Sequence, residues 1–304
     1  MNHQEPRQDS ISVVRPVAAR GLSSVAVVAE AEEAQRALER AALLNLAPEA
    51  RVAILIRHGE GSPGPLGARL GPSGERLAAR VQATGGHLSL ISLTEDEDMT
   101  AAVERGREQH RPELVIIARE PRGLLARLFG AAPEKLARHG HVPILLTQLP
   151  AKHPYRRVLV GIDYSEASHQ ALEMALRLKG PGPEALDVLH CHDTGYALVM
   201  HQAGASAHQM VDYYRDEQVQ AEATLRGFLR PYLDGGANLH PLVKSGDPRV
   251  ELEGTAHERG AELLVVGKRG NHGLGHTLMG VSEASMRRAG CDVLIVPHTD
   301  PTRH

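Results

Sequence analysis

The chain has 304 residues, 42% of them hydrophobic and 23% charged, which is enough for two globular domains of about 150 residues. Its formal net charge of −3 gives no basic field for nucleic acid or anionic lipid, and 3% aromatic residues argue against a base-stacking platform. It has two cysteines, no apolar run of about 18 residues and no N-terminal signal-peptide pattern, so we expect a cytoplasmic protein without disulfides or membrane insertion.

The sequence contains an internal repeat, with one unit beginning at Ser24 and another near Arg156. Each unit opens with a short apolar strand and continues with an alanine-rich helix that carries Ala-Leu-Glu, at 37–39 and at 171–173. Apolar strands then alternate with helical patterns to the end of each unit, which is typical of a doubly wound parallel sheet. Further strands are predicted at 52–56, near Leu88 and at 142–147 in the first unit, and at 186–190, near Leu239 and at 293–296 in the second.

The expected fold is therefore α/β, with two tandem doubly wound domains. Each is a mainly parallel five-stranded sheet of Rossmann-like type with helices on both faces. The predicted organisation is a flexible N-terminal tail over 1–22, a degenerate domain over 23–149, a linker over 150–155, a domain with a ligand site over 156–298, and a C-terminal tail over 299–304.

The second unit carries a glycine pattern directly after a predicted strand. Gly267, Lys268, Arg269 and Gly270 follow the apolar run 263–266, and after nine residues Gly280, Val281 and Ser282 begin a predicted helix. Glycines let backbone N–H groups approach an anion, and a helix N-terminus favours negative charge. The pattern predicts a phosphate cradle at the carboxyl end of the sheet.

Asp163 ends the first strand of the same unit and should reach the same crevice, because parallel strands share their carboxyl edge. A carboxylate there suits a ribose hydroxyl or an adenine amine. Its alternative role is a helix-start acid beside the N-cap Ser165.

Together these residues resemble the nucleotide-binding branch of the universal stress protein family, whose pattern is Gly-x2-Gly-x9-Gly-Ser/Thr. The resemblance covers nearly all of 156–297, including VLVGIDYSEAS and SGDPRVELEGTAHERGAELLVVGKRG. It implies an adenine nucleotide alpha hydrolase-like fold. It also implies that Asp163 and a strand-two residue near Val188 contact adenosine, while the glycine loop and Ser282 hold phosphates.

Two departures from the family pattern stand out. Val281 occupies the place of the family's Ser or Thr, with the hydroxyl one residue later at Ser282. In the first unit Ala29 replaces the aspartate, and Ala118 and Pro121 replace two glycines. We interpret the first unit as a degenerate copy that stabilises or positions the second.

The expected function is a stress-response protein that binds ATP, or ADP or AMP, in its second domain, with Mg²⁺ accompanying the triphosphate. No nucleophile–base–orienter set or Walker-type Gly-Lys-Ser/Thr is present in the sequence, so no catalytic residue is assigned. The alternatives are a nucleotide-free interaction module with vestigial sites and a weak ATPase. The resemblance further implies an internal pseudo-dimer in which 142–147 pairs antiparallel with 293–296; a homodimer and an unknown protein partner remain open.

Histidines suggest a second hypothesis. His190 and His192 should lie on one face of a strand, with His201 and His208 as further candidate zinc ligands. Histidines are abundant throughout the chain, so the sequence favours no metal site. The helix predicted over 207–229, with Met210, Tyr213 and Tyr214, is expected to shield apolar surface.

Overall fold

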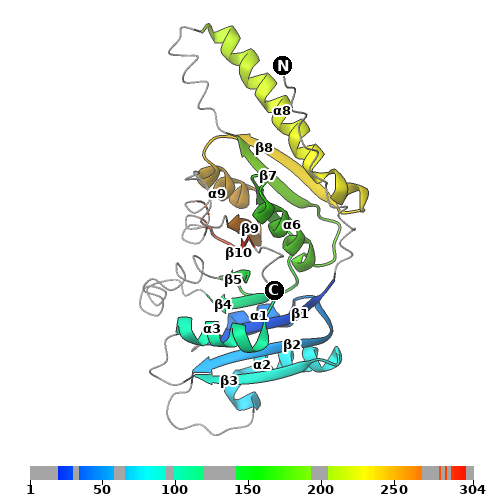
Figure 1. Ribbon diagram of the computed structural model, residues 1–304, viewed down its shortest axis with the longest axis vertical. Coiled ribbons are helices and arrows are strands. Elements are labelled where there is room, and N and C mark those ends of the chain that lie inside the picture. Colours follow the sequence, from blue (N-terminus) through cyan, green and yellow to red (C-terminus); the bar gives the residue numbers. More distant parts are fainter. Residues whose placement is uncertain are drawn as a thin grey trace, which may run out of the picture.

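The computed structural model describes residues 20–29, 34–57, 66–93, 99–118, 142–192, 205–268, 281, 285 and 289–298. They form one ten-stranded sheet flanked by helices (Figure 1). The elements of the first half are β1 Leu22–Ala29, α1 Ala34–Ala42, β2 Leu46–Arg57, α2 Leu66–Ala83, β3 His87–Leu93, α3 Met99–His110, β4 Leu114–Ala118 and β5 Ile144–Thr147. Those of the second half are β6 Val158–Ile162, α6 Glu166–Leu178, β7 Leu186–His192, α8 Ala207–Asp234, β8 Leu239–Ser245, α9 Pro248–Glu258, β9 Leu263–Lys268 and β10 Asp292–Pro297.

The strand order is symmetric about the centre of the sheet. It runs β3-β2-β1-β4-β5-β10-β9-β6-β7-β8, so each half contributes five strands in the same relative order. The halves meet where β5 and β10 pair antiparallel, with Leu145 opposite Leu294. The antiparallel pairing predicted between 142–147 and 293–296 is therefore confirmed, and it joins the two expected five-stranded sheets into one.

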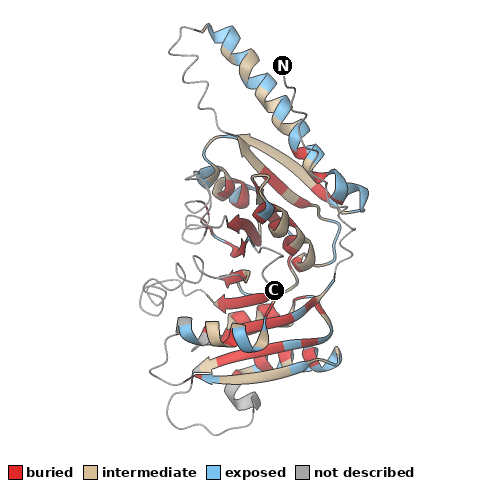
Figure 2. Cartoon of the chain, viewed as in Figure 1, coloured by how far each residue is buried: buried red, intermediate tan, exposed pale blue. Residues whose placement is uncertain are grey.

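The strands are apolar because both faces of the sheet are covered. In β1 the alternate residues Val25 and Val27 belong to one core cluster, whereas Ala26 and Val28 belong to another on the opposite face. Helices α1, α2, α6 and α8 contribute to the first cluster, which extends through both halves. Helices α3 and α9 cover the other face, and the central strands are buried (Figure 2).

A buried carboxylate fixes the junction between the halves. Asp292, the first residue of β10, is 0% exposed and accepts hydrogen bonds at Oδ1 from the backbone N–H groups of Gln148, at 2.6 Å, and Leu149, at 2.9 Å. Its Oδ2 accepts from the Tyr155 hydroxyl at 2.5 Å and lies 3.3 Å from Nε of Arg40 in α1. The Arg40 guanidinium stacks 3.8 Å above the Tyr155 ring, so a first-half cation, the linker and a second-half acid form one buried network.

Helix α8 fulfils its expected role only in its second half. It extends to Asp234, and its buried residues Leu225, Leu229 and Tyr232 all lie in its second half. Its first half projects beyond the sheet, with Val211 and Tyr214 exposed (Figures 1 and 2). The predicted shielding of apolar surface by this helix is therefore confirmed for its second half, whereas Tyr214 in the first half is exposed because the sheet ends before this part of the helix. Among the described helices, none is both long enough and apolar enough to cross a membrane.

Two imidazoles lie where the second half of α8 meets the sheet. The His169 ring of α6 is 4.2 Å from the Phe228 ring, and its Nδ1 is 3.1 Å from the Tyr232 hydroxyl. Burial lowers the pKa of His169, opposed by the nearby Glu166 carboxylate. Burial also lowers the pKa of His190, opposed by its bond to the Ile162 carbonyl and by Asp163. Both histidines therefore favour their neutral forms in the folded protein.

Replacing Asp292 with Asn should lower the free energy of unfolding by about 3–5 kcal/mol, because Arg40 then stays buried without its counter-charge. Urea denaturation followed by circular dichroism measures this change. The matched control is Asp212→Asn, which removes an ion pair to Arg215 whose side chains are 44% and 65% exposed, and should change stability little. Equal effects of the two variants would contradict a central role for Asp292.

Lowering the pH from about 7.5 to about 5.5 should destabilise the protein, because unfolded histidine titrates near pH 6.5 and the folded pKa values of His169 and His190 lie lower. The unfolded state then binds more protons, so stability present above the unfolded pKa is lost as the pH falls. The double variant His169→Asn/His190→Asn should lose less stability than the parent between these pH values. His208→Asn, at an 87% exposed side chain, should leave the pH dependence unchanged.

Candidate functional site

The candidate site lies at the carboxyl ends of β6, β7 and β9. Ser165 caps α6 by accepting a hydrogen bond from the Ser168 backbone N–H, and this starts the helix immediately after β6. The pairing of Gly161 with Val266 puts the ends of β6 and β9 side by side. Asp163 and the segment Gly267–Lys268 therefore share one edge of the sheet, as the sequence predicts.

The Asp163 side chain is partly buried, and one of its two carboxylate oxygens accepts hydrogen bonds from Ser165. Its Oδ1 accepts from the Ser165 backbone N–H at 3.1 Å and from the Ser165 hydroxyl at 2.5 Å. In the described part of the chain, Oδ2 has no hydrogen-bond partner. The predicted role at the helix start is therefore confirmed for one oxygen, whereas contact of the other oxygen with a ligand stays a prediction.

Gly267 is required by packing within the domain. A Cβ at this position would lie 2.7 Å from the carbonyl carbon of Ala167 and 2.9 Å from the Ser168 nitrogen. The first turn of α6 thus rests directly on β9, and any side chain would push the helix away. The glycine pattern predicts close approach of an anion at this position, and it gives no sign of the contact with α6. Lys268 is 8% exposed, and its carbonyl accepts from the His298 N–H at 3.2 Å.

Two of the predicted site residues have their side chains in the core. Val188 is 0% exposed and pairs with Val160 in the middle of the sheet. Val281 is also 0% exposed and packs in the cluster of Leu252. This burial explains an apolar residue where the family pattern has a hydroxyl, and it leaves only the backbone of either valine for a ligand. Arg269, Gly270, Gly280 and Ser282 lie outside the described residues, so the phosphate cradle stays a prediction.

Sequence reasoning missed Tyr164 at this edge. Tyr164 has a left-handed backbone with φ of 63°, a conformation that side chains rarely adopt, and its ring lies 4.4 Å from that of His190. His190 is fixed by a 2.9 Å contact between Nδ1 and the Ile162 carbonyl. The unusual φ directs the chain sharply from Asp163 into α6. No local sequence signal marks it, because the strain arises from the turn between strand and helix.

The zinc hypothesis finds no support in the part of the chain that the structure describes, where no group of three or more His, Cys, Asp or Glu could hold a metal ion. His208 lies on the exposed start of α8, 3.5 Å from Asp212. His192 instead contacts Gln218, and His201 lies outside the described residues.

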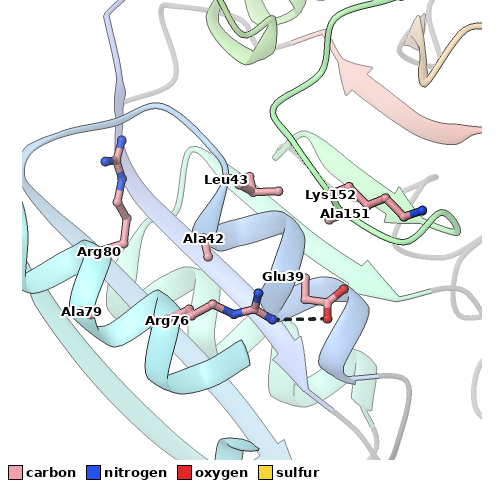
Figure 3. Close-up of a pocket in the computed structure, with 8 residues that line it drawn as sticks. All are labelled: Glu39, Ala42, Leu43, Arg76, Ala79, Arg80, Ala151 and Lys152. Atoms are coloured by element: carbon pink, nitrogen blue, oxygen red, sulfur yellow. Dashed lines mark ion pairs between the residues drawn. The ribbon is translucent and has the colours of Figure 1, made fainter. Parts of the chain in front are cut away.

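A separate pocket of about 400 Å³ lies between α1, α2 and the linker (Figure 3). Arg76 turns toward Glu39, at 3.6 Å, whereas Arg80 and Lys152 point away from this pair on opposite sides. Its polar groups do not converge on a common point as they do in a typical ligand site. The strand ends of the second half, where one Asp163 oxygen has no partner among the described residues, remain the better candidate.

Known proteins resemble the second half of this chain in sequence. Residues 154–297 match the sequence model described as Universal stress protein family. Universal stress protein YxiE of Bacillus subtilis is 28% identical over 146 residues, which span 47% of this chain and 99% of that protein. Universal stress protein Sll1388 of Synechocystis sp. is 27% identical over 152 residues, again 47% of this chain and 99% of that protein.

Solved structures extend the likeness in fold to both halves. A universal stress protein from Archaeoglobus fulgidus superposes with a TM-score of 0.62 at 17% identity, covering 93% of this chain and 98% of that one. A putative universal stress protein from Pseudomonas aeruginosa gives 0.59 at 19% identity, covering 92% and 95%. The sequence match is confined to the second half, whose strand ends carry Asp163 and Gly267. Residues 154–297 of this chain are therefore similar to the universal stress protein family.

Proposed function

We propose that this protein is a stress-related regulatory module that binds ATP, or the related ADP or AMP, at the strand ends of its second half. The observation that carries the proposal is the half-engaged carboxylate of Asp163 beside Gly267 and Lys268. The Asp163 oxygen that has no partner in the described part of the chain would accept a hydrogen bond from a group such as a ribose hydroxyl. The backbone after Lys268 and the predicted helix start at Gly280 to Ser282 would hold phosphates, with Mg²⁺ accompanying the triphosphate.

The residues at the strand ends of the first half support the proposal that the protein has one nucleotide site, in its second half. Strand β1 of the first half ends at Ala29, where the second half has Asp163, and β4 ends at Ala118, where the second half has Gly267. An alanine methyl group offers no acceptor for a hydroxyl. We therefore infer that the first half acts as a scaffold, docked to the second through the Asp292 network and the β5–β10 pair.

The competing function is a nucleotide-free interaction module. The buried Val281 side chain favours it, because the position that carries a hydroxyl in the family serves the core here. The exposed Val211 and Tyr214 on the projecting start of α8 fit the same reading. No binding of adenine nucleotide to the unmodified protein would select this function.

Isothermal titration with Mg-ATP tests the proposal. Asp163→Ala should weaken binding about tenfold or more, since a hydrogen bond to a charged acceptor is lost. The control is Ser165→Ala, which removes the hydroxyl bonded to Asp163 and the helix cap but keeps the carboxylate. Equal losses in both variants would mean that Asp163 acts only through α6. Gly267→Val is unsuitable, because its side chain would displace α6 whether or not a ligand binds.

A further inference from the structure

A row of polar side chains runs from the Asp163 edge toward α8. We define this polar seam as Tyr164, His190, His192 and Gln218. The Tyr164 and His190 rings are 4.4 Å apart, and His192 Nε2 lies 3.4 Å from Gln218 Oε1 of α8. His190 and His192 are two residues apart on β7, so their side chains lie on the same face of the strand. The seam therefore begins beside Asp163, the residue before Tyr164.

The hydrogen bonds around Gln218 set the proton position on His192. Gln218 donates through Nε2 to Glu222 Oε1 at 3.0 Å, so its carbonyl oxygen faces His192. That oxygen only accepts, which puts the imidazole proton on His192 Nε2 and leaves Nδ1 as an acceptor. His192 Nδ1 is buried and has no hydrogen-bond partner in the described part of the chain.

A backbone carbonyl determines which ring nitrogen of His190 carries the proton. His190 Nδ1 is 2.9 Å from the Ile162 oxygen, which only accepts, so Nδ1 carries the proton. Burial lowers the pKa of His190, which keeps the imidazole neutral near pH 7. His190 Nε2 is therefore a second acceptor of the seam.

Tyr164 supplies a donor. Its hydroxyl oxygen is buried without a hydrogen-bond partner among the described residues. Burial raises the pKa of Tyr164 to about 12, so the hydroxyl keeps its proton. A buried hydroxyl and a buried imidazole nitrogen that both lack partners are uncommon in one small region, because each loses its bonds to water on folding. A bound ligand would supply the missing partners.

We propose that the polar seam recognises the exocyclic amine of a purine nucleotide, with His190 Nε2 and His192 Nδ1 accepting from the amine and the Tyr164 hydroxyl donating to a ring nitrogen. This inference rests on the proposed function, since it assigns the base-recognition residues of the same nucleotide. It makes Tyr164, His190 and His192 specificity-determining residues.

The hydrogen-bonding group at position six of the base determines which purine fits this seam. An amine offers two N–H donors to two imidazole acceptors, whereas the oxo group of hypoxanthine or guanine would place an acceptor against both. The seam should therefore favour ATP over inosine triphosphate, which has an oxo group in place of the amine at position six and a proton on the neighbouring ring nitrogen.

The test compares three probes on the intact protein: Mg-ATP, Mg-inosine triphosphate and Mg-tripolyphosphate. The unmodified protein should bind ATP more tightly than inosine triphosphate. Tyr164→Phe should weaken ATP binding about three- to tenfold, leave tripolyphosphate binding unchanged and reduce the preference for ATP. Without ligand, its thermal midpoint should stay the same or rise, because a buried hydroxyl without a partner is removed.

The matched control is Tyr232→Phe, whose hydroxyl already contacts His169 at 3.1 Å and lies outside the seam. It should keep the preference for ATP. A second variant, His192→Leu, should reduce the preference for ATP as Tyr164→Phe does. The inference is overturned if ATP and inosine triphosphate bind equally to the unmodified protein, or if Tyr164→Phe keeps the preference. If none of the three probes binds to the unmodified protein, the proposed function is overturned together with this inference. If ATP and inosine triphosphate bind without preference for either base, this inference alone is overturned.

Discussion

The structure depends on one buried carboxylate, that of Asp292. Placing a charge at 0% exposure is costly unless its oxygens are occupied, and here two backbone N–H groups, one tyrosine hydroxyl and one guanidinium occupy them. These partners come from α1 and the residues directly after β5 in the first half, and from Tyr155 of the linker. Because they meet at the first residue of β10, the network fixes how β10 lies against β5, and so makes one sheet out of two halves.

The two ends of the second half use carboxylates in different ways. Asp292, where β10 begins, has both oxygens engaged and belongs to the framework. Asp163, where β6 ends, has one oxygen engaged by the start of α6 and one without a described partner. Similar chemistry thus serves assembly at one end of the sheet and is available for recognition at the other, where parallel strands leave room for ligands.

The surroundings of the candidate site are set by tight packing. The first turn of α6 touches the backbone of Gly267, and Tyr164 adopts a strained φ to connect β6 with that helix. On the other side, the second half of α8 is held by Leu225, Leu229 and Tyr232 and by rings that contact His169 and Tyr164. The site is therefore built on rigid elements, while the start of α8 extends away from them.

The sequence by itself determined the repeat and the α/β class, because these follow from apolar periodicity that is local in the chain. The antiparallel pairing of the last strands was expected only from the resemblance to the universal stress protein family. The sequence also placed Asp163 and Gly267 at one edge. Only the tertiary structure decided that Val188 and Val281 point into the core and that Gly267 is required by α6. It also brought Arg40, Tyr155 and Asp292 into one network and Tyr164 onto His190. These contacts join residues distant in sequence or depend on a single turn, so no local pattern encodes them.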